Sequence, residues 1–241
     1  MKTRIAQAYP DRIEVRGRDL AGDLMGKVTF TEHFHLLLTG EEPTEEQRFF
    51  LDLLLVSIAE HGLMPTNVTA RMTFASDPGS LQGAVAAGIL GCGPVILGTA
   101  EECARLLAQS HGRDPLEVAR DVHDAGGRMP GFGHPVHAPL DPRAERILEL
   151  ADEHGVSGPH TDLACGLGAA VAEVWGQPLT MNVSMPIASV MLDLGFPASS
   201  VKAVPILART ASLLAHLAEE QEEPIGLGLA KAADEAVEYE R

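Results

Sequence analysis

One loop of the 241-residue sequence gathers side chains that suit the recognition of a carboxylate. It runs from Met129 to Arg143 and reads Met-Pro-Gly-Phe-Gly-His-Pro-Val-His-Ala-Pro-Leu-Asp-Pro-Arg. Its two Gly residues, on either side of Phe132, let the backbone approach a ligand closely. The loop presents His134, and Arg143, at the start of the next helix, offers a planar fork of donors that fits a carboxylate. The combination predicts a loop that binds an anion.

Three more basic side chains are candidates for the same site. Arg209 lies in a mostly apolar stretch, where a buried guanidinium needs either an anionic ligand or an internal salt bridge. His61 stands where a helix should end, so interaction with the helix dipole is the alternative to ligand binding. Arg71 is open between the same two roles, and His216 is expected to be structural.

Composition limits the classes of partner. With 34 acidic and 18 basic residues the net charge is −16, so the surface repels phosphate backbones and excludes nucleic acid. Cys92, Cys103 and Cys165 have no metal-ligand spacing, and no metal site is expected. No apolar N-terminal segment and no window near the ~18 apolar residues of a membrane span are evident. We therefore expect a cytoplasmic protein without a membrane partner.

Helical signals dominate the chain after residue 30. Thr44 and Gln47 form a capping box that begins a helix ending near Gly62. Around residues 11–30 a short alternating section indicates one strand or an extended arm. The pattern predicts an all-α fold of about ten to twelve helices. The expected later helices are 80–90, 99–110, 115–126, 143–154, 160–175, one ending at 194, 200–219 and an acidic C-terminal one.

The loop resembles the signature loop of the citrate synthase family, which includes the citryl-CoA lyases. Further similar motifs lie along nearly the whole chain, and its length resembles the short citryl-CoA lyase-like branch. They are Arg16-Gly17, residues 36–44, Glu60-His61-Gly62, Thr69-Ala70-Arg71 and residues 205–216.

This resemblance implies a two-domain, all-helical homodimer without a covalently bound cofactor. Residues 1–100 and 204–241 would form the large domain and residues 101–203 the small one. An oxo acid or other carboxylate would be the substrate, with a CoA thioester as its candidate partner. The oxo acid would be held by His61, His134, Arg143 and Arg209, and the expected pocket also includes Arg71, Asn182 and Ile96. The CoA adenine would meet the backbone of Met129, Pro130, Gly131, Phe132 and Gly133.

Two positions depart from the family's catalytic pattern. Ile96 stands where the family has the His that stabilises an enol, and Ser184 follows Asn182-Val183 where the family has the Asp base. Isoleucine has no hydrogen to donate, and a serine hydroxyl cannot take a thioester α-proton without its own base. His134 and Ser184 remain the candidate catalytic residues. Ordinary citrate synthesis is not expected unless Glu101, Glu102 or His137 substitutes.

Two other family features are missing. Ala138 replaces an expected basic residue, and no C-terminal Arg is evident near residues 223–225. Three hypotheses follow: a carbon–carbon lyase or synthase of the citryl-CoA type, a CoA-independent β-oxo-acid decarboxylase or retro-aldol lyase, and an inert carboxylate-binding paralogue.

Overall fold

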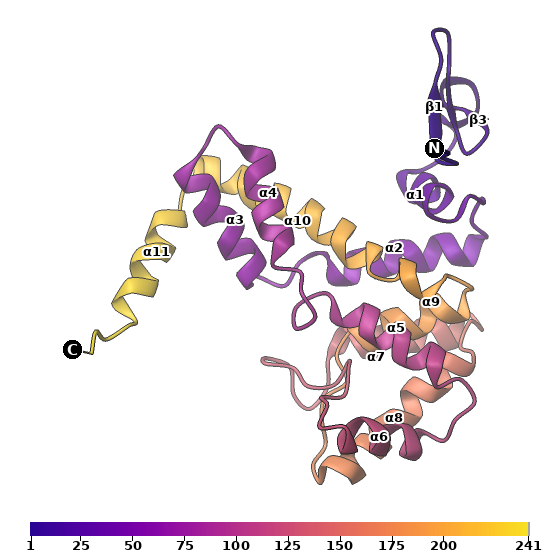
Figure 1. Cartoon of the computed structure of the whole chain (residues 1–241), viewed down its shortest axis with the longest axis vertical. Helices are drawn as coiled ribbons and strands as arrows, with labels where there is room; N and C mark the ends of the chain where they lie inside the picture. The colour runs from indigo at the N-terminus through magenta and orange to yellow at the C-terminus, as the bar shows by residue number, and fades with distance from the viewer. Residues whose placement is uncertain (241) are drawn as a thin grey trace.

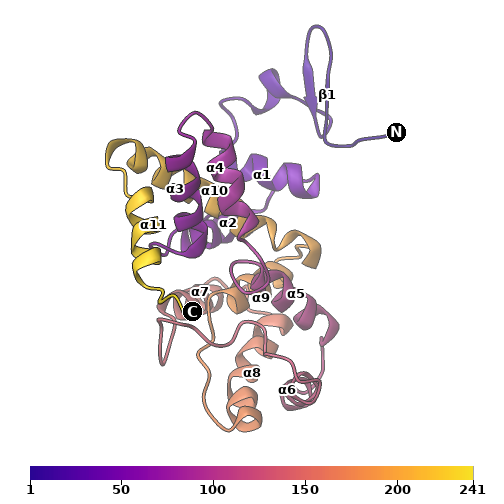
Figure 2. The same cartoon turned by 60° about the vertical axis from the view of Figure 1, so that its left-hand side comes forward.

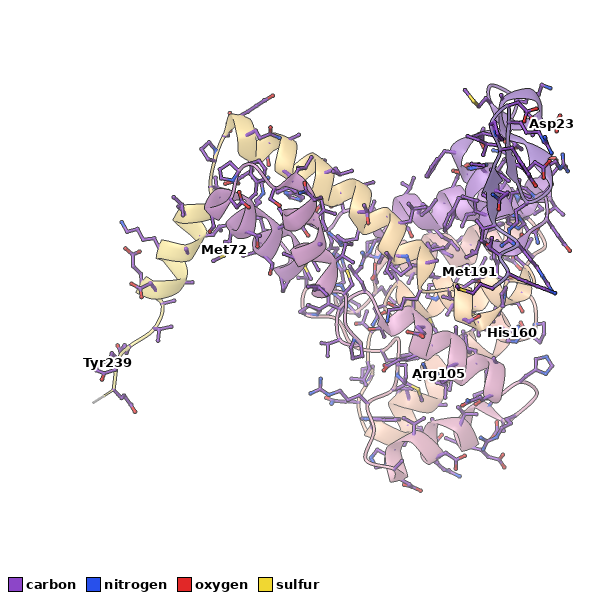
Figure 3. The ribbon with its side chains drawn as sticks, turned by 45° about the horizontal axis from the view of Figure 1, so that its top comes forward. Asp23, Met72, Arg105, His160, Met191 and Tyr239 are labelled. Carbon is purple, nitrogen blue, oxygen red and sulfur yellow. The ribbon has the colours of Figure 1, made fainter. Side chains whose placement is uncertain are left out.

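The computed structural model describes residues 1–240, and this part of the chain is mostly helical, with eleven α-helices. The all-α prediction is confirmed. The molecule is elongated: a body of helices, a helical arm and an N-terminal hairpin lie at three corners of the view in Figure 1. Figure 3 labels Met72 in the arm, Met191 in the body and Tyr239 at the far end of the C-terminal tail.

The N-terminal segment forms a small antiparallel sheet rather than one strand. The strands β1 (Ala6–Ala8), β2 (Ile13–Val15) and β3 (Arg18–Asp19) pair in sequence order, and Figure 2 shows them projecting from the molecule. After a π-helical turn at Leu20–Leu24 comes α1 (Phe30–Thr39). Val15, Leu24 and Leu36 form a small cluster that fastens the sheet to α1.

The body is built around α9 (Ser184–Asp193), whose first eight residues are all buried. The surrounding helices are α5 (Thr99–Gln109), α6 (Pro115–Asp124), α7 (Pro142–Glu153) and α8 (Pro159–Trp175), each close to its predicted bounds. Asp193 accepts hydrogen bonds from the backbone N–H groups of His160 (3.0 Å) and Thr161 (2.9 Å), so the end of α9 caps the start of α8.

The arm consists of four helices with a separate small core. They are α3 (Pro65–Ser76), α4 (Leu81–Leu90), α10 (Ala203–Glu222) and α11 (Gly226–Glu235). Ala70, Phe74, Ala84, Leu213 and Leu217 pack together between them. Gly88 permits this close approach, since a Cβ there would lie 2.7 Å from a methyl of Leu213.

Two long helices connect the arm with the body. The predicted capping box begins α2 (Glu45–Ala59): Thr44 Oγ1 accepts from Gln47 N–H, and the Gln47 side chain accepts from Thr44 N–H. Phe50 and Leu54 of α2 join Val204 and Ala208 of α10 in the same hydrophobic cluster as α5–α9. This cluster contains residues from both predicted domains, on either side of residue 204. The division into a small domain of residues 101–203 and a large domain therefore stays a prediction.

One segment is more apolar than expected from the sequence. Residues 198–222 contain an 18-residue window of mean hydropathy 1.2, long and apolar enough to cross a membrane by length and composition alone. The expectation that no such window exists was therefore wrong. In the structure 44% of that window is buried against the rest of the protein.

Arg71 of α3 makes a buried ion pair with α10. Its Nη1 donates to Glu220 Oε2 at 2.9 Å, and both side chains are 1% exposed. A second ion pair joins Arg71 to the exposed Glu219, and Nε donates to His216 Nδ1 at 3.1 Å. Glu220 Oε1 also accepts from the backbone N–H of Gly226 (2.7 Å), so the pair fixes the start of α11.

We expect Glu220→Gln to lower the free energy of unfolding by about 3–5 kcal/mol, because it leaves the Arg71 charge buried without its partner. The double variant Arg71→Met/Glu220→Leu should recover most of that loss, since no buried charge remains. Urea denaturation measures both, with Glu222→Gln on the exposed side of α10 as the control. A single variant as stable as the control would contradict the buried pair.

Candidate active site

A cavity of about 530 Å³ lies where the arm and the body meet. It is enclosed by the end of α2, the start of α3, the loop before α5, the loop before α7, the start of α9 and the first half of α10. Its lining residues are Ile58, His61, Met64, Pro65, Val95, Ile96, Leu97, Thr99, Gly133, His134, Pro135, Arg143, Asn182, Val183, Ser184 and Arg209.

Most of the predicted pocket residues come together here, although they are far apart in the sequence. The lining includes eight of them: His61, Ile96, Gly133, His134, Arg143, Asn182, Ser184 and Arg209. Arg71 is not among them, because the structure places it in the ion pair with Glu220. An internal salt bridge, the alternative that the sequence left open for Arg71, is what the structure shows.

The loop expected to meet a CoA adenine lies largely behind this cavity. Gly131 C=O accepts from Asn182 N–H (2.8 Å), Gly133 N–H donates to Thr180 C=O (2.7 Å), and Phe132 pairs with Met181. A Cβ at Gly131 would lie 2.8 Å from Cβ of Met185, so only glycine fits against α9. Met129, Pro130, Gly131 and Phe132 do not line the cavity, and their role in CoA binding stays a prediction.

Asp141 holds Arg143 in place. Asp141 is 1% exposed, and its carboxylate accepts from Arg143 Nε (3.0 Å), Arg143 Nη2 (2.8 Å) and Val183 N–H (3.2 Å). Burial raises the pKa of Asp141, but the hydrogen bonds and charge of Arg143 outweigh it and keep the pKa below its usual value. A fixed carboxylate therefore orients the guanidinium, whose Nη1 makes no hydrogen bond with any residue in the described range 1–240.

The backbone fixes the tautomer of His134. Its Nδ1 accepts from the N–H groups of Val136 (3.1 Å) and His137 (2.8 Å). These two bonds require the lone pair on Nδ1, so the neutral ring carries its hydrogen on Nε2, which lies 3.4 Å from the Nη2 donor of Arg143. Burial, His137 and Arg143 lower the pKa of His134, which favours this neutral form. His134 can thus donate a hydrogen bond to a ligand oxygen.

Arg209 is a buried cation with unused donors. It is 2% exposed, its Nη1 donates to Asn67 Oδ1 (2.9 Å), and its Nε has no partner among the described residues. Burial lowers its pKa, although the nearby Glu60 charge opposes this. An anion in the cavity that Arg209 lines would offset this buried positive charge.

Glu60 was not predicted, although it directly precedes His61 in the sequence. Its carboxylate accepts from the backbone N–H of His61 (2.9 Å) and from the hydroxyl of Ser212, and it lies 3.0 Å from His216 Nε2. Burial opposes ionisation, but these hydrogen bonds keep the pKa of Glu60 below its usual value. This charged group orients the His61 backbone and links it to α10.

His137 was suggested by the sequence only as one of three substitutes for the missing acid and base. In the structure its Nε2 lies 3.0 Å from His61 Nε2, and its ring stacks on that of His134 with centroids 4.4 Å apart. Burial, Arg143 and His137 itself lower the pKa of His61. Glu101, another suggested substitute, is paired with Lys202 at 3.1 Å and does not line the cavity.

The three histidines are close enough to be considered as a metal site. One ring nitrogen from each of His61, His134 and His137 lies within 4.8 Å of the others. A ligand nitrogen must offer a lone pair, however, and Nδ1 of His134 already accepts two backbone hydrogen bonds while its Nε2 carries the hydrogen. The donor set therefore fits a metal ion poorly, although nothing in the sequence indicated that these three histidines would lie together.

Acid should destabilise this site. His61 and His134 have pKa values below the ~6.5 of an unfolded chain, so the unfolded state binds more protons as the pH falls through 6.5. Their contribution is fully present above that pH and is lost on acidification, and the lowered pKa values of Glu60 and Asp141 add a further loss below about pH 4.5.

We expect the melting temperature to fall between pH 7.5 and 5.5, and to fall less in His134→Asn. The Asn Oδ1 can replace Nδ1 as the backbone acceptor but does not titrate. Differential scanning calorimetry across the pH range measures this, with the exposed His123→Asn as the control. A slope equal to that of wild type in His134→Asn would contradict the assigned role of its neutral ring.

Comparisons with known proteins agree with this geometry. Residues 1–226 match the family model described as citrate synthase, C-terminal domain. The citrate synthase of Haloferax volcanii is 29% identical over 196 residues, covering 79% of this chain and 51% of the relative. Putative citrate synthase 2 of Mycobacterium tuberculosis is 30% identical over 202 residues, covering 80% and 52%. The chain thus spans about half the length of these curated relatives.

Solved structures give the same result. The citryl-CoA lyase of Hydrogenobacter thermophilus superimposes with a TM-score of 0.84 at 30% identity, covering 91% of this chain and 86% of the other. The ATP citrate lyase of Methanothrix soehngenii, in complex with citrate and coenzyme A, has a TM-score of 0.83 at 20% identity and shares the fold. With the family model matching nearly the whole chain, the protein belongs to the citrate synthase family.

Proposed function

We propose that this protein is an enzyme of the citryl-CoA lyase type, which breaks a C–C bond in a thioester derived from an oxo acid. One observation carries the proposal: His61, His134, Arg143 and Arg209 converge on one cavity, and none of the described residues lining it is a carboxylate. Two cations and a hydrogen-bond donor suit the carboxylate and oxygen of an oxo acid. The similarity in fold to the Hydrogenobacter lyase, at 30% identity, supports the lyase type.

The missing carboxylate favours C–C cleavage over citrate synthesis. Synthesis must begin by taking a proton from the thioester α-carbon, which requires a positioned base. Ser184 and Ile96 both line the cavity. The family resemblance assigns their positions to that base and to a histidine. Cleavage instead forms the enolate by breaking the C–C bond, and water can then protonate the enolate.

The remaining lining selects for a substrate with an apolar part. Ile58, Met64, Val95, Ile96 and Leu97 share the cavity with the cationic groups. A ligand that fills this space must therefore present a carboxylate to the arginines and a less polar body to these side chains. A CoA thioester of a branched or extended oxo-acid adduct meets both conditions.

A CoA-independent lyase or decarboxylase is the second candidate. Ala138 is exposed where the family pattern has a basic residue, so this chain lacks one cation that would meet a phosphate or second carboxylate. A β-oxo acid held by Arg143 and Arg209 could lose CO₂ with the Nε2 hydrogen of His134 stabilising the enolate oxygen. This candidate uses the same anion site and differs only in the absence of CoA.

A second copy of the chain is the proposed partner. The arm exposes apolar side chains, among them Leu81, Leu214 and Leu227 at 40%, 46% and 69%. Covering such a surface by an identical arm would remove it from water. Sedimentation velocity over a range of concentrations should show a dimer, and a monomer at every concentration would contradict this proposal.

The proposed anion site predicts that Arg143→Ala weakens oxaloacetate binding by about 10–150-fold, the value of a charge-assisted hydrogen bond. Isothermal calorimetry with oxaloacetate and with CoA, separately and together, measures the loss. Arg146→Ala is the matched control, because Arg146 lies on the same helix, is 55% exposed and pairs with Glu149.

The same experiment separates the candidate functions. Binding of both ligands, with loss of the oxaloacetate signal only in Arg143→Ala, supports the CoA-dependent lyase. Oxaloacetate binding without CoA favours the second candidate. No oxaloacetate binding by the wild type would contradict both.

A further inference from the structure

The proposed cleavage needs a base, and no carboxylate among the described residues lines the pocket to serve as one. To release the oxo acid, the proton of the substrate's hydroxyl group must leave as the C–C bond breaks. Among the described residues lining the cavity, the ionisable groups are His61, His134, Arg143 and Arg209. His134 holds its hydrogen on Nε2 and uses its Nδ1 lone pair on the backbone, and guanidinium groups are not bases near neutral pH. His61 is therefore the remaining acceptor.

His61 has one nitrogen paired and the other available. Its Nε2 lies 3.0 Å from Nε2 of His137, so one of the two nitrogens must carry a hydrogen and the other must accept it. Its Nδ1 has no hydrogen-bond partner within residues 1–240. The rings are nearly perpendicular, at 88°, and His137 does not line the cavity. The arrangement puts His61 between the substrate space and His137.

We propose that His61 and His137 form a proton relay, in which His61 takes the proton of the substrate's hydroxyl group and His137 receives the proton that His61 gives up. This inference rests on the proposed lyase function. His61 is the residue that touches the substrate, and His137 acts through it as a positioning residue.

The relay step balances without a further reactant. The hydroxyl O–H bond breaks and its proton joins Nδ1 of His61, while the hydrogen on Nε2 of His61 moves to Nε2 of His137. The oxygen's electron pair forms the C=O bond of the oxo acid, and the electrons of the broken C–C bond become the thioester enolate. Water then protonates that enolate. The hydroxide that remains takes the Nδ1 proton of His61 while His137 returns the hydrogen to Nε2 of His61, so both rings regain their starting forms.

The surrounding charges explain why a second histidine is needed. Burial, Arg143, His137 and Arg209 all lower the pKa of His61 and so disfavour a positive charge on it, while Asp141 opposes them. Passing the proton on keeps His61 neutral in this buried and cationic environment. The stack of His137 on the neutral ring of His134 holds the acceptor in position.

Replacing His137 by Phe tests the relay, because Phe keeps the ring and its stacking but has no nitrogen. We expect kcat for citryl-CoA cleavage to fall by about 10²-fold or more with KM unchanged, and the pH dependence of kcat to change shape. The control is His123→Phe, since His123 is exposed and packs on Trp175 on α8. Unchanged kcat in His137→Phe would overturn the relay alone, whereas a wild type that does not cleave citryl-CoA would overturn the proposed function and the relay with it.

Two further measurements do not depend on the rate. In ¹⁵N-histidine NMR spectra, we expect His61 and His137 to share one hydrogen near neutral pH, His134 to be protonated on Nε2, and His137→Phe to shift the His61 nitrogens. A His61 spectrum unaffected by that substitution would contradict the pairing. EDTA should leave the activity unchanged, and loss of activity that Zn²⁺ restores would show that the three histidines bind a metal instead.

Discussion

The ion pair between Asp141 and Arg143 is the interaction on which the site depends. Asp141 is almost completely buried at the start of α7, and it also accepts the backbone N–H of Val183 just before α9. The same carboxylate therefore joins two helices and aims one guanidinium. Asp141 thereby fixes the guanidinium of Arg143, the end of the loop that carries His134 and the start of α9 relative to one another.

The site also shows how a chain with a net charge of −16 can hold an anion. The global charge repels anionic ligands, but the field inside a cavity is set by the groups that line it. Arg143 is held by Asp141, while Arg209 keeps an Nε donor unsatisfied in a buried position. Glu60 and Asp141 do not line the cavity themselves. They hydrogen-bond to His61 and Arg143, respectively, and so position these two basic residues.

Local sequence signals predicted most of the helices, because each signal depends on neighbours in the chain. The Thr44–Gln47 capping box is of this kind, whereas α1 and α3 were not predicted individually. The short strands at the N-terminus were missed as a sheet, since two or three residues carry too little alternation to show pairing. The family resemblance supplied the pocket residues, and eight of them line one cavity.

The long-range pairings could not be predicted from local patterns. Arg71 meets Glu220 across 149 positions, and His61 meets His137 across 76. Nothing in the spacing of an isolated Arg or His distinguishes a salt bridge from a ligand contact, because the partner is chosen by the fold.

The path of α10 couples the core of the body to the core of the arm. Its first half packs Val204 and Ala208 into the body, and its second half packs Leu213 and Leu217 into the arm. Local unfolding of the arm would disturb α10, the continuous helix that also carries Arg209. Amide hydrogens of α3 and of α9, although they lie in different cores, should therefore exchange with similar free energies of opening, and a ligand bound at the cavity should slow the exchange of both.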